Sequence, residues 1–518
     1  MKTKIFLFLL SLLSLVSCDK YLEEKPLDKL TSDTFYTNDQ NLDQAIYGAY
    51  STILYYWRDS RGAGGNIYTM GDVRSDDITL PTDGANYSAI YPFETYNYNA
   101  SDGNIRGLWS ALYQGVSRAN VIIEKVTPLA IGNGVTELKK YTVLAEAHAL
   151  RGYLYYQLVR YWGDVPLLVK SIGSGNDENM YPARETTAKV YEQIVKDMKA
   201  SLGEGSDPKI ILPVSTGGTN SARLSRGAAY GLLAEVYLTI KDWTNAALYA
   251  KKAIDLNLYG LWPEYKDVFS MVNKGKAVPT DTKGRKGRIE GIWEMQFYQE
   301  IDPGTVVTIT TMPRGKYVSD YIISNRAGDG NYCATKSLFD SFLPIDARRA
   351  HIFPAQYKDQ TGKLQNFPAT PGVTGGMYMT KYTLEGQPLA VWGNSGNQIS
   401  IIRYPDILLA YAEAINELSG PTPEAYAAIN EVRQRAKIAD LTGLDKNSFR
   451  DAIFQERRTE FLFECRRYFD LQRTGKIVSE LAKVGIVVDP NRILLPIPQT
   501  ELDNNLNDDG FKQNPGYN

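Results

Sequence analysis

The sequence of 518 residues predicts a mainly α-helical fold, in which helix pairs stack into an α-α superhelix. Two observations support this fold class. Apolar residues recur at intervals of three and four over several segments, which is the period of an amphipathic helix. Small residues recur at matching places in successive segments, which lets paired helices approach closely. Long stretches rich in Gly, Pro, Thr, Asn and Tyr separate these segments and predict loops.

The clearest helix pair covers residues 224–256. Ala234 and Ala246 lie on either side of a turn and place small side chains where the two helices meet. This spacing matches the tetratricopeptide pattern of about 34 residues. A second, looser pair covers residues 401–436, with Pro421 in its turn.

Two further helix pairs are predicted nearer the N-terminus. One joins residues 41–57 to 108–126, and the other joins 138–161 to 189–202. Because a single repeat unit cannot bury its apolar face, about three or more must stack. The sequence therefore predicts a tetratricopeptide-like scaffold of about four helix pairs.

Two long inserts interrupt this scaffold, at about residues 59–105 and 260–400. Both lack a helical period and are rich in turn-forming residues, so we expect loops with a few short strands. The segment 291–298 is one such strand. The helix pairs on both sides of the inserts belong to one scaffold. We therefore expect residues 18–518 to form a single domain.

Residues 1–17 have the pattern of a signal peptide. A short basic stretch precedes an apolar run that is shorter than the roughly 20 residues of a membrane-spanning helix. The run ends in Leu15-Val16-Ser17-Cys18, which resembles a bacterial lipobox. We therefore expect Cys18 to become the lipid-bearing N-terminus. The alternative is an ordinary secretory signal with a cysteine nearby by chance.

The composition excludes several classes of function. The net charge is -2, so no strong field favours nucleic acid. Cys333 and Cys465 are the other cysteines, which is too few for a disulfide framework. The chain contains 36 Tyr against 16 Phe, and tyrosine suits surfaces where one end of the side chain meets water.

The sequence patterns that carry catalysis or hold metals are missing. Neither His148 nor His351 has a second His or Cys at metal-ligand spacing. The carboxylates within residues 72–77 lie close together, but such clusters are expected among 59 acidic residues. An EF-hand loop that began at Asp503 would require Gly at its sixth position and Glu at its twelfth, where this chain has Asp508 and Asn514. We therefore expect a protein that is not an enzyme and has no cofactor or metal.

The charge-dense block 449–473 predicts a structural element. Four apolar residues in it recur at helical spacing, namely Phe461, Cys465, Tyr468 and Leu471. Oppositely charged residues at i, i+3, such as Arg457 with Glu460, suit ion pairs along one helix. A structural latch is favoured here over an anion-binding site.

A series of short motifs occurs in order along the chain. They are Leu15-Val16-Ser17-Cys18, Asn41-Leu42, Leu108-Trp109, Arg118-Ala119-Asn120, Ala149-Leu150-Arg151, Tyr161-Trp162-Gly163-Asp164, Arg403-Tyr404-Pro405-Asp406, Glu456-Arg457-Arg458, Leu495-Pro496-Ile497-Pro498 and Asn514-Pro515-Gly516-Tyr517. Through these motifs, the chain resembles the SusD/RagB family of outer-membrane nutrient-binding lipoproteins over essentially its whole length.

The resemblance implies a function in nutrient capture. Family members sit as lids over a SusC-like TonB-dependent transporter and help load glycans or, in some members, peptides. Acidic residues soon after Cys18 resemble the surface-export signal of Bacteroidetes lipoproteins. The resemblance thus implies a protein that is lipid-anchored in the outer membrane and faces the cell exterior.

Capture of a neutral glycan requires flat aromatic side chains and a few fixed polar groups. We look for both in the inserts, because aromatic residues in helices also serve the core. The candidates in the first insert are Tyr68, Asp72, Arg74, Tyr87, Tyr91, Tyr96 and Asn97. The candidates in the second insert are Tyr298, Tyr378 and Trp392. For each of them, packing inside the protein is the alternative role.

The residues do not exclude two other functions. A peptide ligand would need main-chain partners and fewer stacked aromatic residues, so the density of tyrosines favours a glycan. Tetratricopeptide arrays also bind proteins, which makes an interaction scaffold without its own small-ligand site the third possibility. We assign the helical surface to the transporter.

Overall fold

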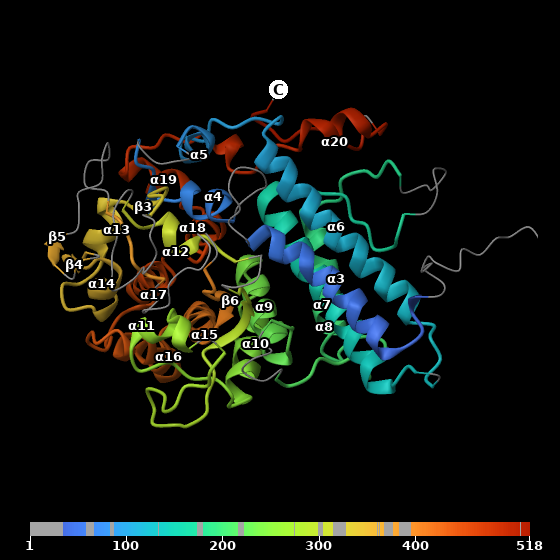
Figure 1. Cartoon of the computed structure of the whole chain (residues 1–518), viewed down its shortest axis with the longest axis horizontal. Helices are drawn as coiled ribbons and strands as arrows, with labels where there is room; N and C mark the ends of the chain where they lie inside the picture. The colour runs from blue at the N-terminus through green and yellow to red at the C-terminus, as the bar shows by residue number, and fades with distance from the viewer. Residues whose placement is uncertain are drawn as a thin grey trace, which may run out of the picture.

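Four helix pairs form the scaffold of the protein (Figure 1). The computed structural model describes residues 35–57, 67–82, 87–132, 134–172, 180–215, 222–273, 275–298, 304–313, 328–359, 361, 363–366, 377–382, 395–507 and 509–517. The pairs are α3 (Asp39–Trp57) with α6 (Gly103–Val126), α7 (Glu137–Trp162) with α8 (Thr187–Ala200), α9 (Arg226–Thr239) with α10 (Trp243–Asp255), and α15 (Tyr404–Ser419) with α16 (Pro423–Arg435).

The observed pairs are those that the sequence predicts, and the expected mainly helical class is confirmed. Helix α6 also packs against α7, and α10 against α15, so that neighbouring pairs continue into one another. Many helices begin at a side chain that accepts a hydrogen bond from a free backbone N–H of the first turn. These caps are Asp102, Thr136, Thr186, Ser225, Asp242, Thr422 and Asp445.

Gly115 allows the three N-terminal helices to approach closely. A Cβ atom at this position of α6 would lie 2.6 Å from Thr52 Oγ1 on α3 and 2.7 Å from Leu154 Cδ1 on α7. Both distances are far below van der Waals contact. The absence of a side chain at this position therefore sets the spacing of α3, α6 and α7.

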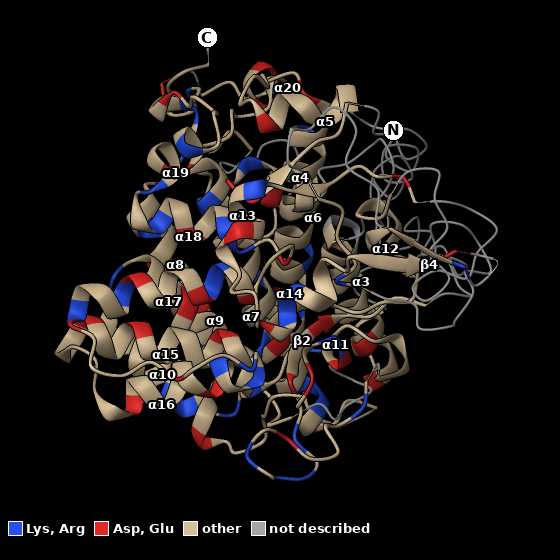
Figure 2. Cartoon of the chain, turned by 90° about the vertical axis from the view of Figure 1, so that its left-hand side faces the viewer, with Lys and Arg blue, Asp and Glu red and all other residues tan. Residues whose placement is uncertain are grey.

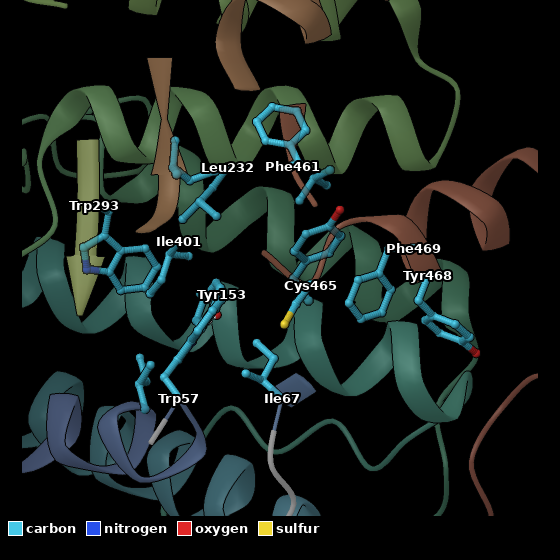
Figure 3. Packing of buried hydrophobic residues seen from close by; sticks show 14 of the residues in the cluster. Trp57, Ile67, Tyr153, Leu232, Trp293, Ile401, Phe461, Cys465, Tyr468 and Phe469 are labelled. Atoms are coloured by element: carbon cyan, nitrogen blue, oxygen red, sulfur yellow. Dashed lines mark hydrogen bonds between the residues drawn. The ribbon is translucent and has the colours of Figure 1, made fainter. Parts of the chain in front are cut away.

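The core lies where α7 meets elements from the rest of the chain (Figure 3). Trp57 Nε1 donates a hydrogen bond to Tyr153 Oη on α7 at 3.0 Å. The ring of Tyr153 contacts the edge of Trp293, with ring centroids 4.8 Å apart. Cys465 and Phe461 approach the same region from the C-terminal part of the chain (Figure 3). Residues far apart in sequence thus share one apolar interior.

The described residues of the inserts and their borders form three short antiparallel strand pairs. They are β1 (Ile78–Thr79) with β3 (Cys333–Ala334), β2 (Gly291–Met295) with β6 (Ile399–Arg403), and β4 (Gln356–Lys358) with β5 (Leu364–Asn366). The strand expected within 291–298 is therefore confirmed as β2. Because β1 lies in the first insert and β3 in the second, this pair joins the two inserts.

The inserts also hold short helices, which their lack of periodicity did not predict. They are α4 (Ile67–Met70), η2 (Asp72–Arg74), α5 (Tyr87–Glu94), α11 (Tyr265–Val268), η4 (Met271–Asn273), α12 (Val307–Thr310), α13 (Lys336–Ser341) and α14 (Ala347–Ile352). A single turn of helix is too short to show a period. Contacts with the rest of the protein stabilise such turns.

The C-terminal part consists of short helices packed against the scaffold and the inserts. They are α17 (Lys446–Glu460), α18 (Arg467–Thr474), α19 (Ile477–Lys483), η5 (Pro490–Arg492) and α20 (Gln499–Asn504). The predicted continuous apolar stripe is interrupted between α17 and α18. Phe463 and Cys465 have φ angles of 56° and 58°, a conformation that ends a helix.

Figure 2 shows charged residues along α17 and α18. Several of them pair with residues of other elements. Arg457 donates from Nε to Asp470 at 2.8 Å and lies 3.3 Å from Glu235 of α9. Glu460 pairs with Arg348, Arg403 and Arg435. Arg457 and Glu460 of α17 are thus paired with other residues and not with each other as expected, whereas Asp470 and Arg473 do pair at i, i+3 along α18. The expected structural role is confirmed, because these buried pairs join α9, α14, α16 and β6 to the C-terminal helices.

The N-terminal anchor expected at Cys18 lies outside the described residues. The described chain begins with Phe35 and Tyr36, whose rings meet edge to face with centroids 5.2 Å apart. None of the helices in the described ranges combines the length and apolar character needed to cross a bilayer.

Candidate functional site

Two tyrosines of α5 form a stacked aromatic pair on the first insert. The rings of Tyr87 and Tyr91 are stacked, with centroids 4.8 Å apart and planes inclined by 27°. Tyr91 is 42% exposed, and Tyr87 is partly buried. Spacing of i, i+4 places both rings on the same side of a helix. Two of the predicted ligand-binding residues therefore lie together at the surface.

The opposite side of α5 fixes this helix on the protein. Ile90 and Phe93 are buried, and Phe93 stacks on Tyr98 with ring centroids 5.1 Å apart. The backbone N–H of Asn97 donates to the carbonyl of Pro92 at 2.7 Å and closes the turn after the helix. These buried contacts fix the position of α5 and of the tyrosine pair that it carries.

Titratable groups surround the tyrosine pair. Burial has the largest influence and raises the pKa of the Tyr87 hydroxyl, and the charge influences of Tyr91 and Glu94 and a hydrogen bond with Tyr91 raise it further. Burial also raises the pKa of Glu94, whose carboxylate accepts a hydrogen bond from Thr79 Oγ1 at 2.7 Å. Exposed Asn97 follows the helix and adds an amide. An apolar ring face beside uncharged polar groups suits a neutral, hydroxylated ligand.

Four other candidates of the first insert lie in the interior. Tyr68 stacks on Phe463, with ring centroids 4.4 Å apart. Asp72 accepts a hydrogen bond from the backbone N–H of Cys465 at 3.0 Å. Burial, the largest influence, raises the pKa of this carboxyl to about 7. These two side chains are enclosed by protein, and ligand contact by them stays a prediction.

Arg74 and Tyr96 are the other two enclosed candidates. The Arg74 guanidinium donates to Tyr98 Oη at 2.8 Å and lies over the ring of Tyr468, 4.3 Å from its centroid. Tyr96 donates from its hydroxyl to the backbone carbonyl of Arg74. Tyr96 also has a φ of 57°, so a left-handed turn directs its side chain inward. Both residues join the insert to the C-terminal helices, and a ligand role for them stays a prediction.

The candidates of the second insert differ in their surroundings. Tyr298 is 56% exposed and follows β2, whereas Tyr378 is buried. Trp392 lies outside the described residues. Among the described candidates, Tyr87, Tyr91, Asn97 and Tyr298 therefore offer exposed surface to a ligand.

The carboxylates of the segment 72–77 have structural partners. Asp76 accepts two hydrogen bonds from Arg467, and Asp77 accepts one from Arg458. Within the described ranges, no group of three His, Cys, Asp or Glu side chains is arranged to hold a metal ion. Asp76 and Asp77 are therefore engaged in ion pairs with buried arginines.

A hollow lies beside α20, partly on elements that the sequence assigned to the scaffold. Its volume is about 250 Å³, and its lining includes Trp109, Tyr113, Glu501 and Phe511. Trp109 is only 3% exposed and donates a hydrogen bond to Glu501. The Tyr113 hydroxyl donates to the carbonyl of Pro166 at 2.8 Å. Its aromatic groups are thus largely occupied by the protein itself.

Two family models match the sequence. The model described as the SusD family matches residues 365–517, and the model described as starch-binding associating with outer membrane matches residues 20–238. A SusD-like protein from Formosa agariphila is 26% identical over 98% of this chain and 99% of its own length. A SusD-like protein from Bacteroides ovatus is 25% identical over 91% of this chain and 82% of its own length.

Solved structures share the fold. A SusD superfamily protein from Parabacteroides distasonis matches with a TM-score of 0.76 and 22% identity, covering 94% of this chain and 100% of its own. A laminarin-binding SusD-like protein matches with a TM-score of 0.74 and 24% identity, over 93% and 100% of the two chains. Surface glycan-binding protein A from Bacteroides thetaiotaomicron, in complex with laminarihexaose, matches with a TM-score of 0.71 and 22% identity over 92% and 100%.

Proposed function

The chain belongs to the SusD/RagB family, and from this premise we propose that it is a lipoprotein of the outer membrane that captures oligosaccharides without transforming them. In this proposal, residues 1–17 are removed as a signal peptide, and Cys18 carries the lipid. Residues 18–518 form one ligand-binding domain on the cell exterior, which delivers its ligand to a SusC-like TonB-dependent transporter.

The tyrosine pair of α5 is the observation that carries the glycan proposal. Tyr87 and Tyr91 present a stacked, uncharged aromatic face to solvent. The C–H face of a sugar ring packs on such a surface, while its hydroxyl groups pair with amides such as that of Asn97. Relatives of the same fold are described as binding laminarin and laminarihexaose, which are neutral glycans.

A glycan-array screen of the chain lacking residues 1–18 tests the proposal. We expect binding to neutral oligosaccharides. Replacing Tyr91 by alanine removes the more exposed ring of the stacked pair, and loss of about 1.4 kcal/mol would weaken binding about tenfold. Isothermal titration calorimetry with the best oligosaccharide of the array measures this change.

Tyr181→Ala is the matched control, because Tyr181 is 39% exposed and lies outside both inserts. We expect unchanged affinity for this variant. Equal affinities of wild type, Tyr91→Ala, Tyr87→Ala and Tyr298→Ala would refute the proposed site. Binding to a peptide library, with no response on the glycan array, would replace the glycan by a peptide.

The delivery step requires its own experiment. We expect the full-length chain, extracted in mild detergent, to co-purify with a large TonB-dependent barrel protein. Cys18→Ser should release the protein from the membrane fraction while glycan affinity in solution stays unchanged. Recovery of the Cys18→Ser variant in the membrane at the wild-type level would argue against lipid anchoring.

A further inference from the structure

The hollow beside α20 combines polar and apolar side chains within a volume of about 250 Å³. Glu501 and Asn504 of α20 and Ser110 of α6 line it with a carboxylate, an amide and a hydroxyl. Pro166, which follows α7, and Phe511, near the C-terminus, add apolar groups to the lining. A lining of this kind is typical of sites for small ligands that have both an apolar face and polar groups.

The polar side chains of the hollow keep hydrogen-bonding capacity for a ligand. The indole N–H of Trp109 donates to the carboxylate of Glu501. A carboxylate has two oxygens and accepts several hydrogen bonds, so Glu501 can accept further ones. Ser110 and Asn504 are exposed. Their hydroxyl and amide groups both donate and accept hydrogen bonds.

This mixture of donors and acceptors distinguishes between classes of ligand. An ammonium group only donates hydrogen bonds, and an ionised carboxylate only accepts them. A sugar hydroxyl does both, and it therefore matches all three polar groups of the hollow. Pro166 and Phe511 suit the C–H face of the same sugar ring. A sugar ring therefore fits this lining better than a charged side chain of a peptide does.

The hollow lies at the same end of the protein as the tyrosine pair of α5. Both Figure 1 and Figure 2 show α5 and α20 at the end where the C-terminus lies. The backbone N–H of Gln499, the first residue of α20, donates to the carbonyl of Ala100 at 2.9 Å. Only residues 95–99 separate Ala100 from the end of α5 at Glu94, and this stretch spans at most about 22 Å. Helices α5 and α20 are therefore close enough for one long glycan chain to meet both.

We propose that the hollow beside α20 is a second binding site, which takes a sugar ring of the same neutral glycan that the tyrosine pair of α5 binds. This inference rests on the proposed capture of glycans and extends it to polymeric ones. When one chain occupies both sites, binding at the second site is intramolecular, and the avidity exceeds the affinity of either site alone. The protein then prefers a polysaccharide to its short fragments.

A size series of one glycan tests this proposal. The series runs from disaccharide to polysaccharide of the neutral glycan that binds most tightly on the array. Ser110→Phe places a large ring in the hollow from an exposed helix position. Ser117→Phe is the matched control, because Ser117 is exposed about two turns further along the same helix and does not line the hollow. Isothermal titration calorimetry measures the affinities, and thermal unfolding verifies that both variants fold.

We expect the wild type to bind the polysaccharide about tenfold or more tightly than the disaccharide. Ser110→Phe should lose about tenfold in affinity for the polysaccharide, whereas Ser117→Phe should keep the wild-type value. Asn504→Ala leaves the hollow open and removes the amide, so we expect a smaller loss. When Tyr87→Ala and Tyr91→Ala are combined, weak affinity for the polysaccharide should remain, and adding Ser110→Phe should abolish it.

The outcomes separate this inference from the proposed function. Equal affinities of wild type, Ser110→Phe and Asn504→Ala for the polysaccharide would overturn the second site and leave the tyrosine pair of α5 as the binding site. An equal loss in Ser117→Phe would assign the effect to a disturbance of α6 and would also overturn the second site. If no glycan binds on the array, the proposed function and this inference are overturned together.

Discussion

Arg467 of α18 binds Asp76 of the first insert through two parallel hydrogen bonds, although the two residues are 391 positions apart in the sequence. Nε lies 2.7 Å from Oδ1, and Nη2 lies 2.8 Å from Oδ2. Burial raises the pKa of Asp76, but the hydrogen bonds and charge of Arg467 lower it more, so the net shift is downward. Both side chains are buried, which makes this pair a fixed link between the insert and the C-terminal helices.

Loss of one partner of this pair should destabilise the fold strongly. Arg467→Met leaves the Asp76 carboxylate buried with less compensation, and we expect the free energy of unfolding to fall by about 3–5 kcal/mol. Urea denaturation followed by circular dichroism measures the change. The control is Lys336→Met, which breaks the pair with Asp340 on an exposed helix face and should cost less than about 1 kcal/mol. Similar losses for the two variants would contradict the assigned role.

The spacing of the N-terminal helices should depend on a single glycine. Gly115→Ala forces a methyl group against Thr52 and Leu154, and we expect a loss of about 1–3 kcal/mol of stability. Gly48→Ala on α3 is the matched control, because a Cβ atom there meets nothing within 4 Å. Alanine at position 48 should stabilise by up to about 1 kcal/mol through helix propensity. Thermal unfolding of both variants measures the difference, and equal shifts would refute the close approach.

The scaffold was predictable because its signals are local. Each helix of the four pairs is long enough to show its period, and Ala234 and Ala246 mark the contact within one pair. The inserts were less predictable, since α5 contains Pro92 and is only 8 residues long. Its helix forms because Ile90 and Phe93 are buried, and that burial depends on the rest of the fold.

The sequence does not show which candidate ligand-binding residues are exposed and which are buried. Tyr91 and Tyr96 belong to the same tyrosine-rich segment, yet Tyr91 is exposed and Tyr96 is buried. The left-handed turn at Tyr96 and the cation of Arg74 direct that side chain inward. A helical period does not show whether the side chain of a turn residue points inward or outward. The tyrosine content therefore identified the insert, but it could not distinguish the exposed aromatic residues from the buried ones.

Asp72 should make the stability of the protein depend on pH. Its pKa is about 7 in the folded protein, chiefly because of burial, against 3.8 in the unfolded chain. The folded state thus holds the proton more tightly, so this group lowers stability as pH rises from about 4 to about 7. In Asp72→Asn this contribution is absent, and the amide oxygen still accepts from the Cys465 N–H. The stability of the variant relative to wild type should increase by up to about 4 kcal/mol across that range.

Urea denaturation of both proteins at pH 4.5 and pH 7.5 measures this difference. Asp340→Asn serves as the control, because that carboxylate is exposed and should leave the pH profile unchanged. Parallel profiles of Asp72→Asn and wild type would show that Asp72 is ionised in the folded protein at both pH values.

The hydroxyl of Tyr91 should matter less for ligand binding than its ring. If the ligand stacks on α5, Tyr91→Phe keeps the aromatic face, and affinity for the oligosaccharide should stay within about twofold of wild type. Tyr91→Ala should lose about tenfold under the same conditions. The two variants also separate stacking from hydrogen bonding, because the Tyr91 hydroxyl pairs with that of Tyr87. Isothermal titration calorimetry decides between them. A tenfold loss for Tyr91→Phe as well would assign the interaction to the hydroxyl and would contradict a stacking surface.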